Sequence, residues 1–322
     1  MKRITAILFC VVLIFTMSAC GAGTQQSDGK ISVVTTIFPV YDWVRNVARN
    51  ADDVDVSMLV DSGVDLHSFQ PTVNDILKIS TCDVFVYVGG ESDKWVANAL
   101  KEATNKNLVA INLLDELGDN KREEELKEGM QSEEEEGEEG EEEAEYDEHI
   151  WLSLKNAKIL CDAICEGLCK ADKANSETYR ANLQSYAEEL DGLDKAYFEA
   201  VTAGSQSTLI FGDRFPFRYL TEDYNIDYYA AFIGCSAESE ASFKTIKFLA
   251  DKMDEYALTS IIKIEGSNGN IAKTVIENTK SKNAVILTLN SMQSITAKDV
   301  SNGVTYTDIC KSNLEVLREA LK

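Results

Sequence analysis

The chain has little of several residue types, and each shortage excludes a class of protein. Its 322 residues include only two histidines and three prolines, and 31 basic residues stand against 55 acidic ones, for a net charge of −24. Without a basic run to meet phosphates, a nucleic-acid-binding protein is not expected. An apolar content of 44% is too high for a wholly disordered acidic chain. The length suggests two domains.

Long hydrophobic runs are also scarce. Ile4–Met17 follows the basic Met1–Arg3 and is shorter than the roughly 20 residues that cross a bilayer. This pattern is typical of a signal peptide, which we place at residues 1–19. Small residues directly before Cys20 resemble a bacterial lipobox, in which the cysteine is lipidated and becomes the mature N-terminus. The alternative is a plain secretory signal. Residues 20–30 are small and polar, as in a flexible tether.

The acidity is concentrated in one segment. Residues 119–148 contain 17 acidic and three basic residues, so this segment carries −14 of the net −24. Like charges at this density repel one another, and we expect the Glu-rich stretch to remain unfolded. Two interpretations stay open. The loop either gathers divalent cations through its field or is a solvated insertion without a role in binding.

From Ile31 onward, short β-branched runs alternate with amphipathic stretches of helical spacing. The predicted strands are Ile31–Val34, Val54–Val60, Val84–Val88, Leu108–Asn112, Thr208–Phe211, Asp227–Ala231, Ser260–Ile264 and Ala284–Leu289. Such alternation predicts right-handed crossovers and parallel sheets. We therefore expect an α/β protein with two Rossmann-like lobes, residues 31–172 and 205–322, and a long connecting helix, Ser176–Ala203, within residues 173–204.

The mature cysteines do not form a recognisable disulfide pattern. Cys161, Cys165 and Cys169 recur every four residues in a predicted helix, so they share one face with apolar neighbours. A cysteine in that position usually behaves as a small apolar core residue. A thiolate metal site is the alternative, although neither a CxxC pair nor a nearby histidine supports it.

Both histidines lie in expected loops. His67 follows the second predicted strand, and His149 stands where the acidic segment gives way to a helix. A histidine in a loop is often simply solvated. However, each of the three prolines (Pro39, Pro71 and Pro216) also stands at an expected strand-to-helix loop, and His67 precedes Pro71 closely. In open α/β sheets, ligands bind at the loops beyond the carboxyl ends of the strands.

Several short motifs occur in a characteristic order. They are Val33–Pro39 with Tyr41 and Asp42, Gly63–Pro71, Asp83–Gly90 with Trp95, His149–Leu152 with Asn156 and Ala157, Phe217–Leu220, Gly234–Glu240, and Leu287–Asn290 with Tyr306, Asn313, Leu314 and Leu317. Together they resemble the metal-binding lipoproteins of zinc/manganese ABC importers, the cluster A-I solute-binding proteins. The resemblance covers the chain from Cys20 to Lys322.

The resemblance implies two lobes joined by one rigid helix, with a single metal ion between them. His67 and His149 stand at the two N-lobe ligand positions. The third family ligand precedes the Tyr of a Phe-x-Tyr motif by five residues, a position that Arg214 occupies here. Because arginine cannot coordinate a cation, Asp213 is the expected substitute. Glu265 is the expected fourth ligand.

Glu238 and Glu240 are reserve candidates for the C-lobe ligands. The resemblance also implies a transport component: a monomer, held on the extracytoplasmic face of the cell membrane by its lipid anchor, that delivers the ion to an ABC permease and its ATPase. Zinc is the favoured cargo and manganese the alternative, since a site of nitrogen and oxygen donors accepts both. We do not expect an enzyme. A surface adhesin and a metallohydrolase are the alternative functions, although the sequence has no HExxH pair.

Overall fold

The computed structural model describes residues 30–51, 53–131, 145–236 and 240–322. The predicted signal peptide, the lipidation site Cys20, most of the Glu-rich stretch and Glu238 lie outside these residues. Residues Ile31–Lys322 form one compact unit. Within the described residues, no helix combines the length and the apolarity that a bilayer crossing requires.

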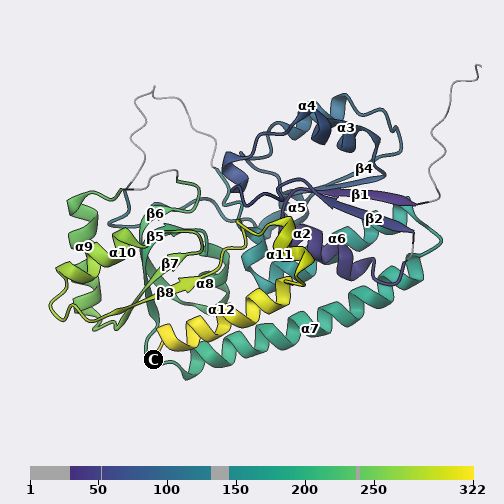
Figure 1. Cartoon of the computed structure of the whole chain (residues 1–322). Coiled ribbons are helices and arrows are strands. Elements are labelled where there is room, and N and C mark those ends of the chain that lie inside the picture. The colour runs from purple at the N-terminus through teal and green to yellow at the C-terminus, as the bar shows by residue number, and fades with distance from the viewer. Residues whose placement is uncertain (1–29, 52, 132–144, 237–239) are drawn as a thin grey trace, which may run out of the picture. The chain divides into compact units, whose positions relative to one another are not determined.

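The N-terminal lobe is built on a parallel sheet of four strands in the order β2-β1-β3-β4 (Figure 1). Helices α3 and α4 pack on one face of the sheet, and α2 and α6 pack on the other. The elements are β1 (Ile31–Thr35), α2 (Phe38–Val47), β2 (Val54–Met58), η1 (Leu66–Ser68), α3 (Val73–Thr81), β3 (Val84–Tyr87), α4 (Val96–Lys101), β4 (Val109–Asn112), α5 (Leu113–Glu116), η2 (Gly118–Asn120), η3 (Ile150–Leu152) and α6 (Leu154–Ala171).

The C-terminal lobe repeats this arrangement with the strand order β6-β5-β7-β8, again all parallel. Its elements are β5 (Thr208–Phe215), α8 (Arg218–Tyr224), β6 (Asp227–Ile233), α9 (Phe243–Glu255), β7 (Ser260–Ile264), α10 (Asn270–Asn278), β8 (Val285–Leu289), α11 (Ala297–Ser301) and α12 (Tyr306–Ala320). Helices α9 and α10 share a hydrophobic cluster with one side of the sheet. The predicted pair of parallel α/β lobes is therefore confirmed.

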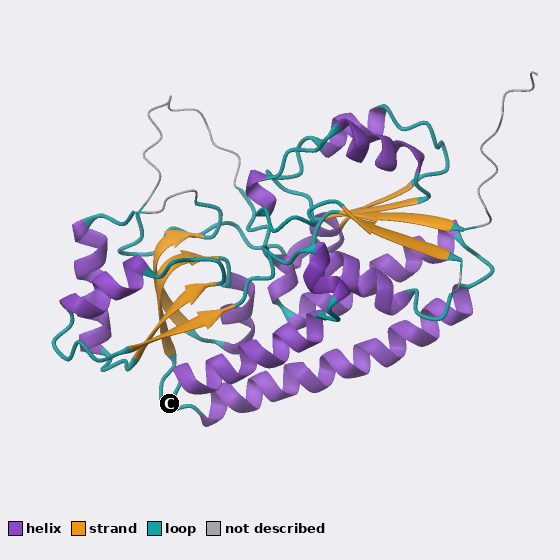
Figure 2. Cartoon of the chain, in the orientation of Figure 1, coloured by secondary structure: helices purple, strands orange, loops and turns teal. Residues whose placement is uncertain are grey.

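One long helix, α7 (Ser176–Ala203), connects the lobes. Its buried side chains recur at helical spacing and include Tyr179, Tyr186, Leu190 and Tyr197. The helix packs against α2 and α6 of the first lobe and against α8 and α12 of the second (Figures 1 and 2). Because α12 in turn contacts both α2 and β8, two helices span the junction.

Helix starts follow local signals in the sequence. Pro39 lies in the first turn of α2, where its fixed φ is compatible with the helix. Thr72 and Asp75 form a capping box at the start of α3, and the side chains of Ser153 and Thr305 accept hydrogen bonds from backbone N–H groups at the starts of α6 and α12. These caps satisfy donors that the first turn leaves without partners.

Two sequence predictions differ in outcome. Cys161, Cys165 and Cys169 are buried in α6, which agrees with a core face. In contrast, the strand predicted to end at Phe211 continues to Phe215, because a shift of register after Phe211 lets β5 go on pairing with β6. The residues around Arg214 are therefore strand and not loop.

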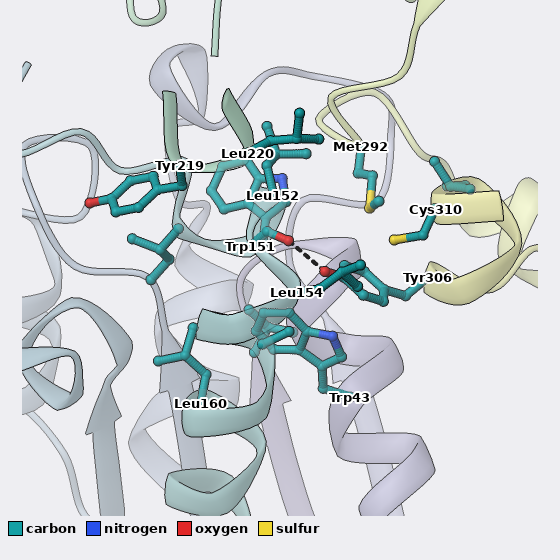
Figure 3. Packing of buried hydrophobic residues seen from close by; sticks show 14 of the residues in the cluster. Trp43, Trp151, Leu152, Leu154, Leu160, Tyr219, Leu220, Met292, Tyr306 and Cys310 are labelled. Carbon is teal, nitrogen blue, oxygen red and sulfur yellow. Dashed lines mark hydrogen bonds between the residues drawn. The ribbon is translucent and has the colours of Figure 1, made fainter. Parts of the chain in front are cut away.

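The core at the junction is centred on three aromatic rings, which Figure 3 shows from close by. Trp43 of α2 makes an edge-to-face contact with Tyr306 of α12, with ring centroids 5.3 Å apart. The Tyr306 hydroxyl donates to the carbonyl oxygen of Trp151 at 2.7 Å, drawn as the dashed line in Figure 3. Trp151 Nε1 donates to the carbonyl oxygen of Ser291 in the C-lobe at 2.8 Å. The segment beside His149 is thus fixed to both lobes.

Candidate metal centre

His67 lies in the short helix η1, beyond the end of β2. The Asp65 side chain caps this helix, and its Oδ1 accepts a hydrogen bond from the His67 backbone N–H at 3.0 Å. On the ring, Nδ1 lies 2.8 Å from Ser92 Oγ and 3.4 Å from a Glu148 carboxylate oxygen. The Ser92 hydroxyl oxygen can accept a hydrogen bond from Nδ1, and the nearby Glu148 carboxylate favours an N–H group on that side of the ring, so we assign the hydrogen to Nδ1 and leave Nε2 with a free lone pair.

His149 is fully buried at the start of η3. Asp147 Oδ1 accepts hydrogen bonds from both the backbone N–H of His149, at 2.8 Å, and its ring Nδ1, at 2.9 Å. An ionised carboxylate can only accept, so Nδ1 carries the hydrogen here as well. A carboxylate behind the imidazole is the arrangement that orients histidine ligands in metal sites.

The two rings face each other through their Nε2 atoms, which lie 3.2 Å apart. With one hydrogen on the Nδ1 atom of each ring, the lone pairs of the two Nε2 atoms point at the same small space. Such lone pairs repel one another unless a proton or a metal ion lies between them. Two nitrogens bound to one tetrahedral zinc ion lie about 3.3 Å apart, given Zn–N bonds of about 2.0–2.1 Å. The pair therefore has the spacing of two ligands of one ion.

Burial and charge separate the pKa values of the two histidines. Burial, followed by the charge on His149, lowers the pKa of His67 to about 4. Burial is the largest influence on His149 and acts to lower its pKa, but the carboxylates of Asp147, Glu148 and Asp65 together raise that pKa above its ordinary value. His67 is therefore neutral at physiological pH, which is the form that binds a metal.

A third donor was missed from the sequence. Among the described residues, Cys235 Sγ forms a group with one ring nitrogen each of His67 and His149, and the three atoms all lie within 4.8 Å of one another. Cys235 follows β6 at its carboxyl end and stands in Gly234–Glu240, a segment in which the sequence suggested only Glu238 and Glu240 as candidate ligands. Its place after a parallel strand is the signal that could have identified it.

Gly234 lets this loop approach His149. A Cβ atom at Gly234 would lie 2.8 Å from His149 Cε1 and 3.0 Å from the carbonyl oxygen of Phe215. Real Cβ atoms do not come this close, so a side chain here would displace the loop or the ring. The glycine is therefore needed for the Cys235 loop and the imidazole to be in contact.

Buried acids surround the three donors. The Glu148 side chain is 1% exposed, and its Oε2, which faces His67, has no hydrogen-bond partner. Burial raises the pKa of Glu148. Burial and then the neighbouring Glu124 carboxylate, which accepts a hydrogen bond from the thiol, raise the pKa of Cys235 above its ordinary value. A bound cation would offset the cost of ionising these buried groups.

The two predicted carboxylate ligands have other partners. Asp213 is buried, and its oxygens accept from the backbone N–H groups of Arg214 at 2.9 Å and Ile264 at 3.4 Å. Glu265 accepts from the N–H and hydroxyl of Ser291, both at 2.7 Å, and from the N–H of Gln293. Among the described residues, the structure does not bring either carboxylate into the group of three donors. Their assignment as metal ligands stays a prediction.

Arg214 connects the two sides of the site. Its Nη2 lies 2.8 Å from Asp65 Oδ2, and its Nη1 donates to the carbonyl oxygen of Ser236 at 3.3 Å. The guanidinium thus contacts both the cap of the His67 helix and the residue after Cys235. Glu240, one of the reserve ligands, is exposed.

Comparisons with known proteins identify the family of the chain. Residues 33–320 match the model of the family described as ZnuA, the periplasmic zinc-uptake complex component A. The zinc-binding protein AdcA of Streptococcus pyogenes serotype M6 is 30% identical over 321 residues, which are 98% of this chain and 61% of that protein. The high-affinity zinc uptake system protein ZnuA of Bacillus subtilis is 30% identical over 322 residues, 98% of this chain and 97% of that protein.

Solved structures show the same fold. The Zn(II)-bound ZnuA-like domain of Streptococcus pneumoniae AdcA superposes with a TM-score of 0.70 at 26% identity, covering 91% of this chain and 99% of that one. The metal-dependent lipoprotein YcdH of Bacillus subtilis gives a TM-score of 0.72 at 26% identity, covering 91% and 100%. This chain spans 61% of the AdcA relatives' length but nearly all of the Bacillus protein. The resemblance seen in the sequence is confirmed, and the chain belongs to the ZnuA family of zinc-uptake components.

Proposed function

We propose that this protein is the extracytoplasmic solute-binding component of an ABC importer, which captures a divalent transition metal and delivers it to a membrane permease. Zinc is the favoured cargo and manganese the alternative. The observation that carries the proposal is the pair of Nε2 atoms of His67 and His149, which face each other at 3.2 Å. The family and its zinc-binding relatives support the same conclusion.

The ligand roles follow from the hydrogen bonds behind each ring. His67 and His149 bind the ion through Nε2, because Nδ1 of each is engaged by Ser92 and Glu148 or by Asp147. Partners of this kind fix the ring orientation and make the ligand more basic. Capture requires no chemical step, so we propose no catalytic residue.

The anchoring of the site indicates how the ion is held. Trp151 lies two residues after His149 and is hydrogen-bonded to Tyr306 and to the Ser291 carbonyl. Since α7 and α12 also span the junction, the ligands are fixed before the ion arrives. A preorganised site loses little conformational entropy on binding, which favours high affinity.

The location and partners belong to the same proposal. Residues 1–19 are a lipoprotein signal peptide, Cys20 is the lipidated residue, and residues 20–30 are a tether that keeps the protein at the outer face of the cell membrane. Residues 31–172 and 205–322 are the lobes, and residues 173–204 connect them. The protein acts as a monomer and meets the permease, which an ATPase drives.

Metal binding tests this function directly. The purified protein, stripped with a chelator and dialysed against zinc, is expected to hold one tight ion. His67→Ala and His149→Ala should each weaken zinc binding by about 100-fold or more, since loss of an outer-shell partner alone costs 10–100-fold. A His67→Ala variant with Lys195→His, on the exposed surface of α7, keeps two histidines and should not recover binding. Absence of tight zinc and manganese binding by the unaltered protein would overturn the proposal.

A further inference from the structure

Among the described residues, the two carboxylates that the sequence predicted as C-lobe ligands are not grouped with the two histidines. The oxygens of Asp213 and Glu265 accept hydrogen bonds from backbone N–H groups, and Arg214 presents a fixed positive charge. Cys235 is the C-lobe residue that the structure places with the two histidines. The question is whether its sulfur is a ligand or a bystander.

The position of the sulfur fits a ligand. On a tetrahedral zinc ion with Zn–S of about 2.3 Å and Zn–N of about 2.0–2.1 Å, sulfur and nitrogen lie about 3.6 Å apart. The Sγ atom of Cys235 lies within 4.8 Å of one ring nitrogen of each histidine, so coordination requires an inward movement of the sulfur.

The surrounding loop is fixed in place. Gly234 allows the backbone to pack directly against the His149 ring. On the other side, the Arg214 guanidinium donates to the Ser236 carbonyl and forms an ion pair with Asp65, and a different side-chain position would break one of these contacts. The cysteine is also distinct in exposure: of the described cysteines it alone is partly exposed, and the other five are buried.

A thiolate changes which ions the site prefers. Sulfur is a soft ligand that favours zinc and other late transition metals, whereas manganese favours oxygen donors. When the metal–sulfur bond forms, the S–H bond breaks and the proton leaves to solvent, so binding one ion releases one proton from this residue. The sulfur thus supplies both a ligand and a negative charge.

We propose that Cys235 is the C-lobe ligand and that the resulting two-histidine, one-thiolate centre selects zinc over manganese. The proposal rests on the metal-capture function argued above and specifies its ligand set and selectivity. Arg214 acts as a positioning residue, which holds the Cys235 loop against the cap of the His67 helix.

Cobalt substitution tests the sulfur ligand without any mutation. Loading the stripped protein with Co²⁺ is expected to give a thiolate-to-cobalt charge-transfer band in the near ultraviolet. The band should vanish in Cys235→Ser and persist in Cys82→Ala, a control that removes a buried cysteine next to the start of β3. A wild-type cobalt complex without this band would overturn the proposal.

Affinity and selectivity give the second test. Competition titrations of the Cys235→Ser protein are expected to show zinc binding about 100-fold weaker, and manganese binding changed several-fold at most, so that the preference for zinc falls. Cys235→His, which restores a nitrogen ligand, should recover zinc affinity without the charge-transfer band. Melting temperatures establish that each variant is folded.

The outcomes distinguish this inference from the function on which it rests. If the unaltered protein binds zinc tightly and Cys235→Ser binds it equally well, the ligand assignment is wrong while the transport function stands. If the unaltered protein binds no zinc, both fail. Zinc should also protect Cys235, located by peptide mass spectrometry, from alkylation under native conditions, and equal labelling with and without zinc contradicts the assignment.

Discussion

Arg214 and Asp65 form an ion pair, 2.8 Å long, that joins the C-lobe to the cap of the His67 helix. Both side chains are about one-fifth exposed. Among the groups that lower the pKa of His67 is the Arg214 guanidinium, after burial and the neighbouring His149. The arginine at a family ligand position therefore acts on the metal centre electrostatically, without coordinating the ion.

Removing that charge should change the titration of His67. In Arg214→Gln, the positive charge that disfavours the imidazolium is gone while Asp65 remains, so the pKa of His67 should rise above its value of about 4. NMR titration of the metal-free protein measures this directly, because the chain has only two histidines. Arg318→Gln, which breaks an exposed ion pair with Glu315, is the control. An unchanged His67 pKa in Arg214→Gln contradicts the electrostatic role.

Gly234→Ala should damage the site through sterics alone. The new Cβ would lie 2.8 Å from His149 Cε1. The ring or the Cys235 loop must then move, and we expect zinc affinity to fall about 10-fold and stability by about 1–3 kcal/mol, the usual cost of overpacking. Isothermal titration and denaturant unfolding measure the two effects.

Gly192→Ala is the matched control for this substitution. A Cβ there would meet no atom within 4 Å, and the residue lies inside α7. Alanine in an exposed helix interior is more favourable than glycine by roughly 0.5–1 kcal/mol, so this variant should be slightly more stable and bind zinc normally. Equal zinc affinity in the two alanine variants would show that the close approach at Gly234 is not needed.

How far the sequence predicts this protein depends on the range of the interactions involved. The strands and the long helix were predictable because hydrophobic periodicity is local: Ser176–Ala203 and Ser260–Ile264 match the observed bounds. The end of β5 was not predictable, because the extension of this strand to Phe215 depends on pairing with β6 across a shift of register. Local pattern carries no information on such pairing.

The residues of the candidate site likewise include some that the sequence predicted and one that it missed. The scarcity of histidine led to His67 and His149, which the structure brings together across 82 positions of sequence. Cys235 was missed because a single cysteine in a loop has no spacing pattern that marks it as a donor. The backbone partners of Asp213 and Glu265 lie up to 51 and 28 positions away, so no local signal shows that these carboxylates are already engaged.

Tyr306→Phe should loosen the packing of Trp151 against His149. The substitution removes the hydroxyl that donates to the Trp151 carbonyl, leaving a buried acceptor without its partner. The expected cost is about 1–3 kcal/mol of unfolding free energy, with a several-fold loss of zinc affinity because Trp151 packs against His149.

Tyr197→Phe is the control for this loss. Tyr197 is buried in α7 and donates a similar hydrogen bond to the Cys310 carbonyl. The Tyr197→Phe variant should lose a comparable amount of unfolding free energy, measured by denaturant unfolding, without a change in zinc affinity. If both variants bind zinc like the unaltered protein, the Tyr306 bond stabilises the fold without tuning the site.

Asp42 should make the stability of the protein depend on pH. It is 6% exposed in α2, where it accepts hydrogen bonds from Tyr306 N–H and the Asn46 amide. Burial, opposed by the Tyr306 bond, raises its pKa from 3.8 to about 6. Between these two values, the folded protein keeps a proton that the unfolded chain has released. The contribution of this group to stability is therefore present at pH 4 and is lost as the pH rises through 6.

Asp42→Asn should remove this dependence. The asparagine amide stays neutral and can still accept a hydrogen bond from the Tyr306 N–H. The stability of the Asp42→Asn variant relative to the unaltered protein should therefore rise between pH 4 and pH 7 by up to about 3 kcal/mol, at about 1.4 kcal/mol per pKa unit. Urea unfolding at each pH measures the difference. Asp42→Ala, which also removes the acceptor, should be less stable than Asp42→Asn throughout. A difference between the unaltered protein and Asp42→Asn that stays constant with pH would show that Asp42 is ionised in the folded state, and that the Tyr306 bond compensates for its burial.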